Sequence, residues 1–417
     1  METPLDRRRF LRLGGGVAAA TVAGGLLAAC GDDGDDKAAA AVTSSTAKPT
    51  GPPKKLKLGI IALTDCAPLV MAKELGFYAE RGLDVTIEKQ ASWPATRDNL
   101  LSGQIDGAHC LNWMPYSVAS GVSGSGTDLK VAMMLNNNGQ AITLAKDFAA
   151  AGYGDLEAAK DILNAKPRTL AMTYPGGTHD LWIRYWLRAT GADESKTKVI
   201  PIPPPQMVAN MKVGTMDAFC VGEPWNQVAV AQDIGFTHIA TQDLWLHHPE
   251  KALVVNSKLA ADKEVLHQLI LGTLEACKWL DNLDNRAEAA TTIGGVAYVN
   301  APAEEIKVRL LGEYDLGAGL GTKKFKGNQM MFHRDGKTNA PLWSYGIWGL
   351  TQYQRFGYLK EAPPYRPLAE SIVLKDDYEK AASEFGIDVP EDMQPLEIKL
   401  DGNTFDPNKP DEEARRP

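Results

Sequence analysis

The stretch that decides the fold is Thr-Leu-Ala-Met-Thr-Tyr-Pro-Gly-Gly-Thr-His-Asp-Leu-Trp-Ile-Arg-Tyr-Trp-Leu, at residues 169–187. Its apolar start predicts a buried strand, and the Pro-Gly-Gly that follows predicts a turn. Thr178 stands where it can cap the aromatic-rich helix that comes next. A strand, a glycine turn and a helix start bring unpaired backbone N–H groups together, which predicts an anion site that the His179 ring would join.

The same order of strand, turn and helix occurs a second time in the chain. Leu-Ser-Gly-Gln-Ile-Asp-Gly at 101–107 returns as Lys-Val-Gly-Thr-Met-Asp-Ala at 212–218. The distance from the end of the first predicted strand to the aspartate is 42 residues in one copy (106 − 64) and 44 in the other (217 − 173). Two copies with the same strand order predict an α/β protein of two βαβαβ-type lobes.

The boundaries of these lobes follow from where the chain crosses between them. We expect crossings near 143–146 and 251–256, and therefore one lobe of residues 54–145 and 252–417 and a second lobe of residues 146–251. The part after about residue 312 is expected to pack on the first lobe as an extension of helices and loops. Ligands of open α/β sheets bind beyond the carboxyl ends of the strands, so the predicted site lies in the cleft between the lobes.

Length, composition and charge limit the class of protein. A chain of 417 residues is too long for one ordinary core, and 44% apolar with 23% charged residues is typical of a soluble globular protein. The net charge of −8 argues against a nucleic-acid partner, which requires a basic face. A small anion would be held by local cations and N–H groups, since the field of the whole molecule repels it.

The N-terminus predicts export and a membrane anchor. Arg7-Arg8-Arg9 resembles a twin-arginine signal, and the apolar stretch after it is too short and glycine-rich for a membrane-spanning helix. Leu-Ala-Ala-Cys at 27–30 resembles a bacterial lipobox, so residues 1–30 are a signal and Cys30 becomes a lipid-bearing N-terminus. An ordinary cleaved signal is the alternative. Residues 31–53 have the composition of a flexible tether, which places the globular body on the extracytoplasmic face of the membrane.

The remaining cysteines are spread singly and predict buried free thiols: Cys66, Cys110, Cys220 and Cys277. The pair His247-His248 has no evident third ligand and is taken as a loop, so we expect no metal and no cofactor. The chain contains no nucleophile elbow, Walker loop or suitably spaced carboxylate pair. No catalytic residue is therefore predicted.

Four residues are candidates for holding an anion. His179 lies at the glycine turn, and Trp93 lies at the matching position of the first copy, where its indole could donate a hydrogen bond. Gln140 follows a predicted strand in a polar run, and Lys251 lies at the second crossing. A buried lysine at ~4 Å from a monovalent anion contributes roughly 4 kcal/mol at an effective dielectric of 20. Secondary candidates are Gly177, Thr178 and Glu223.

At these residues the chain resembles the nitrate-binding lipoproteins of ATP-driven nitrate/nitrite importers and their bicarbonate-binding relatives. The resemblance implies a two-lobed periplasmic-binding-protein-like fold of type II, no catalysis, and delivery of the ligand to an ABC permease and its ATPase. The matching segments cover almost the whole predicted globular body: 62–77, 91–111, 137–146, 174–187, 202–226 and 241–253.

The resemblance places the nitrate contacts on Trp93, Gln140, His179 and Lys251. The bicarbonate relatives look to have an acidic residue at the lysine position that helps to hold calcium, so Lys251 favours nitrate or nitrite without calcium. A shift of one residue would place Glu250 in the pocket instead. The alternatives are a bicarbonate- or sulfonate-binding protein of the same fold, an enzyme similar to those of thiamine-precursor synthesis, and a cytoplasmic nitrate sensor. The exported N-terminus disfavours the last two.

Overall fold

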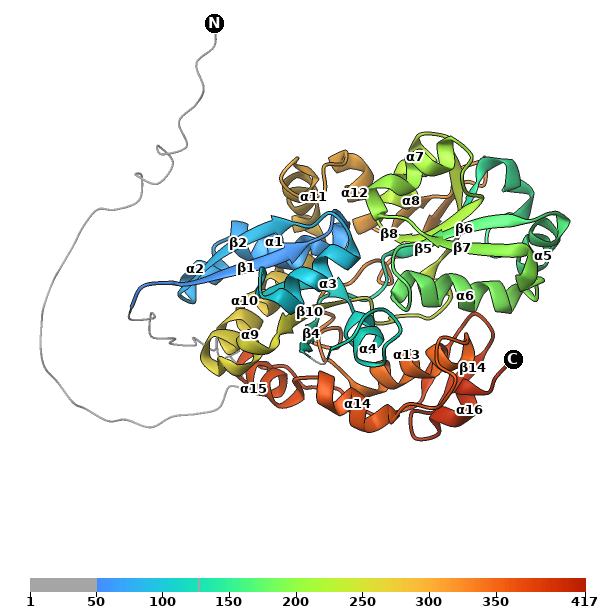
Figure 1. The fold of residues 1–417 in the computed structure, drawn as a ribbon. Coiled ribbons are helices and arrows are strands. Elements are labelled where there is room, and N and C mark those ends of the chain that lie inside the picture. Colours follow the sequence, from blue (N-terminus) through green and yellow to red (C-terminus); the bar gives the residue numbers. More distant parts are fainter. Residues whose placement is uncertain (1–50, 127) are drawn as a thin grey trace, which may run out of the picture. The chain divides into compact units, whose positions relative to one another are not determined.

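The computed structural model describes residues 51–126 and 128–417. The predicted signal, Cys30 and most of the predicted tether lie outside the described residues. The described residues belong to one compact unit, which contains two five-stranded sheets flanked by helices (Figure 1). The predicted two-lobed α/β architecture is thereby confirmed.

The first sheet has the strand order β2-β1-β3-β10-β4. β1 is parallel to β2 and β3, whereas β10 is antiparallel to β3 and β4. The strands are β1 (Lys54–Ile60), β2 (Leu83–Lys89), β3 (Gly107–Leu111), β4 (Leu129–Met134) and β10 (Lys251–Asn256). The helices of this part are η2 (Thr64–Cys66), α1 (Ala67–Glu74), α2 (Phe77–Glu80), α3 (Trp93–Ser102) and α4 (Met114–Ala119).

The second sheet repeats this order as β7-β6-β8-β5-β9. β6 is parallel to β7 and β8, and β5 is antiparallel to β8 and β9. The strands are β5 (Gln140–Ala145), β6 (Arg168–Met172), β7 (Thr197–Pro201), β8 (Ala218–Gly222) and β9 (Gly235–Ala240). The helices are η3 (Lys146–Ala151), α5 (Leu156–Ala165), α6 (Thr178–Thr190), η4 (Glu194–Lys196), η5 (Pro204–Gln206), α7 (Met207–Lys212), α8 (Trp225–Ala231) and η6 (Thr241–Asp243). The duplication read from the sequence is therefore present in the topology.

The crossings between the sheets differ from the expected ones. β5 belongs to the second sheet and β10 to the first, so the chain crosses at 135–139 and 241–250. The expected crossings at 143–146 and 251–256 fall within or beside these strands, and the lobe boundaries move to the segments before them. In each sheet the first strand after a crossing is the antiparallel one. An apolar strand pattern does not show which sheet the strand joins, which is why the sequence misplaced both boundaries.

The C-terminal part packs on both lobes and not on the first alone. Leu374 N–H donates to Val131 O of β4, whereas the Tyr185 hydroxyl of α6 donates to Asp401. Its elements are α9 (Ser257–Ala261), α10 (Lys263–Asp281), η7 (Leu283–Asn285), α11 (Arg286–Gly294), α12 (Ala303–Leu310), β11 (Glu313–Asp315), β12 (Thr322–Lys324), α13 (Trp343–Arg355), α14 (Tyr365–Ile372), α15 (Lys375–Phe385), β13 (Leu396–Ile398), β14 (Asn403–Phe405) and α16 (Pro410–Ala414).

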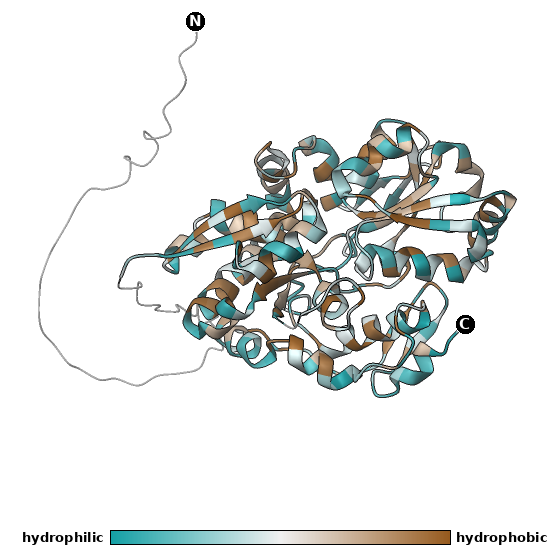
Figure 2. Cartoon of the chain, viewed as in Figure 1, coloured by the Kyte–Doolittle hydropathy of each residue, from teal (hydrophilic) through white to brown (hydrophobic). Residues whose placement is uncertain are grey.

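The core has two large clusters of apolar side chains on opposite faces of the first sheet. Ala252 and Val254 of β10 lie in one cluster, and Leu253 and Val255 lie in the other, as the alternation of a strand buried on both faces requires. Apolar segments recur along the strands of both sheets (Figure 2). The four predicted free thiols are buried and free. Among the described helices, none is long and apolar enough to cross a membrane.

Candidate functional site

The N–H groups of the glycine turn before α6 bond to neighbouring residues, whereas the sequence predicted that they would face an anion. Gly176 has a φ of 72°, and a Cβ there would meet Val122 Cγ1 at 2.9 Å, so the turn requires glycine. Its N–H donates to Asp180 Oδ2 at 2.8 Å, and the Gly177 N–H donates to Tyr174 O at 2.9 Å. The Gly177 N–H expected to face an anion is therefore already bonded within the turn.

The helix cap was also assigned to the wrong residue. The N-cap of α6 is Gly177, with no side-chain cap, and Thr178 is the first helical residue. The Thr178 hydroxyl is buried and has no hydrogen-bond partner in the described part of the chain. Thr178 therefore remains a candidate through its side chain and not through a cap.

His179 has one ring nitrogen fixed and the other without a partner. Nδ1 lies 2.5 Å from the Thr173 hydroxyl at the end of the β6 strand, while Nε2 has no hydrogen-bond partner among the residues described. The side chain is fully buried, and burial lowers the pKa of His179 well below its ordinary value. The ring is neutral at pH 7, and Nε2 is the atom that could meet a ligand.

Trp93 begins α3, which Ser92 caps by accepting a hydrogen bond from Ala95 N–H at 3.3 Å. The indole is fully buried, and its Nε1 has no partner within residues 51–126 and 128–417. Its ring lies 5.7 Å from the His109 ring, and Lys251 Nζ lies 5.9 Å from its centroid. The structure thus brings together two of the predicted site residues, Trp93 at the start of α3 and Lys251 at the start of β10.

Gln140 is the first residue of β5, immediately after the first crossing. Both atoms of its buried side-chain amide lack a partner among the described residues, although its backbone carbonyl accepts from the Thr241 hydroxyl. Across the ladder it faces Gly222, where a Cβ would lie 3.4 Å from Asp65 Oδ2. The ladder partner of Gln140 therefore lies beside the acidic group that also contacts Lys251.

Lys251 is fully buried between two carboxyl groups. Its ammonium lies 2.9 Å from Asp65 Oδ2 and donates to Glu250 Oε1. Burial disfavours the ammonium, but Asp65 and Glu250 offset this and raise the pKa of Lys251. The sequence treated Glu250 and Lys251 as alternatives for the pocket, whereas the structure places both side chains in one cluster.

The sequence analysis did not identify Asp65 as a member of this cluster. The N-cap of α1 is Cys66, with no side-chain cap. Asp65 Oδ1 instead lies 2.6 Å from His109 Nε2, and Ile61 N–H points to His109 Nδ1 at 3.5 Å. Although burial opposes it, Lys251 and His109 hold the pKa of Asp65 well below its usual range. The available signal was an acid at the carboxyl end of the first strand, where ligands of such sheets bind.

The lysine is therefore not a free countercharge, which corrects the sequence-based picture. Asp65 already balances the charge of Lys251, and Glu250 adds a second acidic group. Burial raises the pKa of Glu250 to about 8, although Lys251 opposes this shift. The cluster is neutral when Glu250 is protonated and carries one negative charge when it is not.

Glu223 pairs with an arginine, and its carboxyl group feels the charge of Asp65 in the Lys251 cluster. Its Oε1 is 3.6 Å from Arg309 Nε, and Gln227 N–H donates to its Oε2. Its backbone carbonyl accepts from Thr64 N–H at 2.7 Å, which links β8 to the end of β1. A further link between the lobes is the Trp225 indole, which donates to Ala62 O at 2.9 Å.

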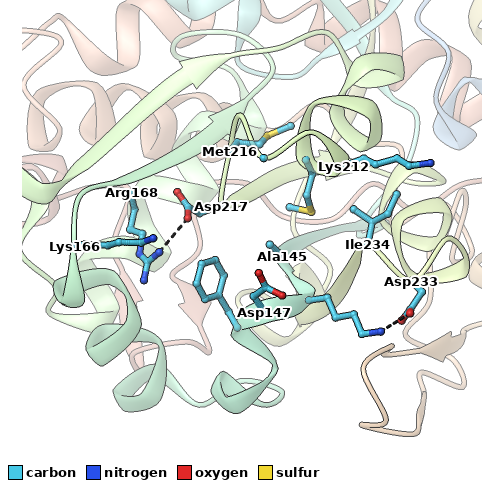
Figure 3. Close-up of a pocket in the computed structure, with 13 residues that line it drawn as sticks. Ala145, Asp147, Lys166, Arg168, Lys212, Met216, Asp217, Asp233 and Ile234 are labelled. Carbon is cyan, nitrogen blue, oxygen red and sulfur yellow. Dashed lines mark hydrogen bonds and ion pairs between the residues drawn. The ribbon is translucent and has the colours of Figure 1, made fainter.

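A separate surface hollow of about 610 Å³ lies at the other end of the second sheet (Figure 3). Arg168, which begins β6, pairs with Asp217 there at 3.2 Å. The His179 turn follows the opposite end of the same strand, so this hollow is distinct from the predicted anion site. No group of three or more His, Cys, Asp or Glu side chains in the described ranges is arranged to hold a metal.

Comparisons with known proteins place the chain in a family. The model of the NMT1-like family matches residues 49–294. The nitrate/nitrite binding protein NrtA of Nostoc sp. is 39% identical, with 86% of this chain and 84% of that protein covered. The bicarbonate-binding protein CmpA of Synechococcus elongatus is 30% identical over 86% and 85%. The crystal structure of the periplasmic nitrate-binding protein NrtA from Synechocystis PCC 6803 matches with a TM-score of 0.82 and 35% identity, covering 87% of this chain and 98% of that chain.

Proposed function

We propose that this chain, which belongs to the NMT1-like family together with the NrtA nitrate/nitrite-binding proteins, captures nitrate or nitrite between its lobes and delivers it to an ABC permease. Trp93, Gln140, His179 and Lys251 are its proposed ligand contacts. The protein acts as a binding component and carries out no reaction of its own.

The observation that carries the proposal is a set of buried polar atoms without partners. Trp93 Nε1, the Gln140 side-chain amide and His179 Nε2 are all buried, and none has a hydrogen-bond partner in the described chain. Leaving such groups unpaired costs about 1–3 kcal/mol each, so a site that keeps three of them is suited to a small polar ligand. Nitrate is planar and accepts hydrogen bonds around its rim, and these side chains can surround it with donors.

The Lys251 ammonium supports an anion held without calcium. It lies between Asp65 Oδ2 and Glu250 Oε1, so the two carboxyl groups already share an internal cation. A divalent cation there would meet an ammonium at the same oxygen atoms and be repelled. A calcium-dependent bicarbonate site is the second candidate, since CmpA is also a relative, and the position of this ammonium disfavours it.

One titration tests the function. The purified protein is titrated with nitrate, nitrite, and bicarbonate with and without calcium, and a change in intrinsic tryptophan fluorescence, to which Trp93 contributes, reports binding. We expect a saturable response to nitrate or nitrite that calcium does not change. A response to bicarbonate that requires calcium, with none to nitrate, would overturn the proposal.

The proposed location is the extracytoplasmic face of the cell membrane, with a lipid on Cys30 as the anchor. The support is the sequence of residues 7–30 and the periplasmic location named for the NrtA relative. Changing Cys30 to Ser should release the protein from the membrane fraction while nitrate binding persists. Equal membrane retention of the variant would contradict the anchor.

A further inference from the structure

The Lys251 cluster holds more acid than base before any ligand arrives. It contains one ammonium and two carboxyl groups, on Lys251, Asp65 and Glu250, and all three side chains are fully buried. With Glu250 ionised the cluster carries one net negative charge. An anion entering next to it would meet like charge where little water screens the repulsion.

The other titratable groups around Glu250 do not supply a positive charge. His179 Nε2 lies 3.8 Å from Glu250 Oε1, and His248 Nδ1 lies 3.9 Å from Oε2. Burial lowers the pKa of His179, of His109 behind Asp65, and of His248, which falls to about 3. Burial and then Glu250 raise the pKa of the Cys220 thiol well above its ordinary value. These groups are neutral near pH 7. Glu223 is a further buried acid whose charge reaches Asp65, and it faces Arg309 at 3.6 Å. Within the cluster of Lys251, Asp65 and Glu250, protonation of Glu250 is therefore the step that changes the net charge near neutral pH.

Glu250 has an atom that is free to hold the proton. Oε1 accepts from the Lys251 ammonium, whereas Oε2 is buried without a hydrogen-bond partner in the part of the chain described. A proton on Oε2 neutralises the acid and turns an unpaired acceptor into a donor, which is the role an anion requires of its neighbours.

We propose that the anion binds only when Glu250 is protonated, so that one proton accompanies each bound nitrate at high pH. The inference rests on the proposed function. Because burial raises the pKa of Glu250 to about 8 in the free protein, the acid already holds its proton at pH 7. Affinity is then nearly constant below about pH 8. Above about pH 8, each pH unit lowers the fraction of protein with a protonated Glu250 tenfold, and nitrate affinity falls tenfold with it.

The test measures the nitrate dissociation constant from pH 6 to pH 10 for the wild type and for Glu250→Gln. We expect the wild-type constant to rise with a slope approaching tenfold per unit above pH 8. The Gln variant, which is neutral at every pH, should lose this rise. Glu88→Gln, which removes a partly exposed acid of β2, is the matched control and should keep the wild-type profile.

Calorimetry of the wild type keeps the test independent of how the variant folds. At pH 9, nitrate is titrated in buffers of different ionisation enthalpy, and the difference gives the number of protons taken up. We expect close to one per nitrate, falling towards zero at pH 6.5. A wild-type affinity that does not change with pH, no uptake at pH 9, or an unchanged slope in Glu250→Gln would overturn the coupling alone. Absence of nitrate binding at every pH would overturn the proposed function and the coupling with it.

Discussion

The ammonium of Lys251 lies 2.9 Å from Oδ2 of Asp65, although the two residues are 186 positions apart in the chain (251 − 65). The other oxygen of Asp65 lies 2.6 Å from His109 Nε2, so both oxygens of this carboxylate are engaged. Asp65 follows β1, His109 lies in β3 and Lys251 begins β10, which is the first strand after the return crossing. The lysine is therefore held in place before any ligand binds.

Changing Asp65 to Asn should destabilise the protein and weaken nitrate binding. The substitution leaves the buried Lys251 ammonium without its ionised partner, and loss of one member of such a pair costs about 3–5 kcal/mol. Since the folded-state pKa of Asp65 is lowered, its stabilising effect is present above its unfolded pKa and lost as pH falls through that value and below it. Urea unfolding at pH 7 measures the loss, with the exposed Asp98→Asn as a control that should unfold like the wild type.

Changing Lys251 to Glu should weaken nitrate binding by well over tenfold. The variant places a third carboxyl group beside Asp65 and Glu250 and removes the only ammonium that contacts them in the described chain. Fluorescence titration gives the affinity. Lys146→Glu, at the partly exposed pair with Asp233, is the control for the change of net charge. Near-normal affinity in Lys251→Glu would remove this lysine from the site.

Changing Trp93 to Phe should reduce nitrate affinity about ten- to hundredfold with little effect on folding. The indole N–H has no partner in the described structure, so its removal breaks no internal hydrogen bond, while one to an anion contributes about 1.5–3 kcal/mol. Calorimetric titration follows the variant. Trp186→Phe removes a second buried indole N–H without a described partner, far along α6, and should bind like the wild type. Equal losses in both variants would point to packing and not to a contact.

Acid should destabilise the fold through its buried histidines. Burial lowers the pKa of His238 to about 4, so the folded state resists protonation that the unfolded chain accepts below about 6.5. The contribution of His238 to the free energy of unfolding is therefore fully present well above pH 6.5, and at pH 5 it is smaller by ~2 kcal/mol. Comparison of urea midpoints at pH 7.5 and pH 5 should show a smaller loss in His238→Gln than in the wild type. His267→Gln, at the surface pair with Glu384, should keep the wild-type loss.

Much of the fold was predictable because it depends on local pattern. The strand at 169–172, the glycine turn and the helix after it lie where the sequence placed them, with helix α6 at Thr178–Thr190. The matched signature at 101–107 and 212–218 predicted two lobes of one topology, and the two sheets have it. Hydrophobic period and turn residues act over a few positions, so they can be read directly from a single chain.

The partners of the site residues were decided by tertiary structure alone. The sequence pointed to Trp93, Gln140, His179 and Lys251, but it did not point to Asp65 and treated Glu250 as an alternative to Lys251. Neither the Asp65–Lys251 pair nor the unbonded state of the Gln140 amide has a local signature, because both depend on which sheet β5 and β10 join. Strand order brings residues from distant segments together, and their mutual burial then sets which of them hold charge. By itself the sequence determined two lobes and predicted an anion site between them; the folded chain decided that the lysine predicted for that site is already balanced by an aspartate.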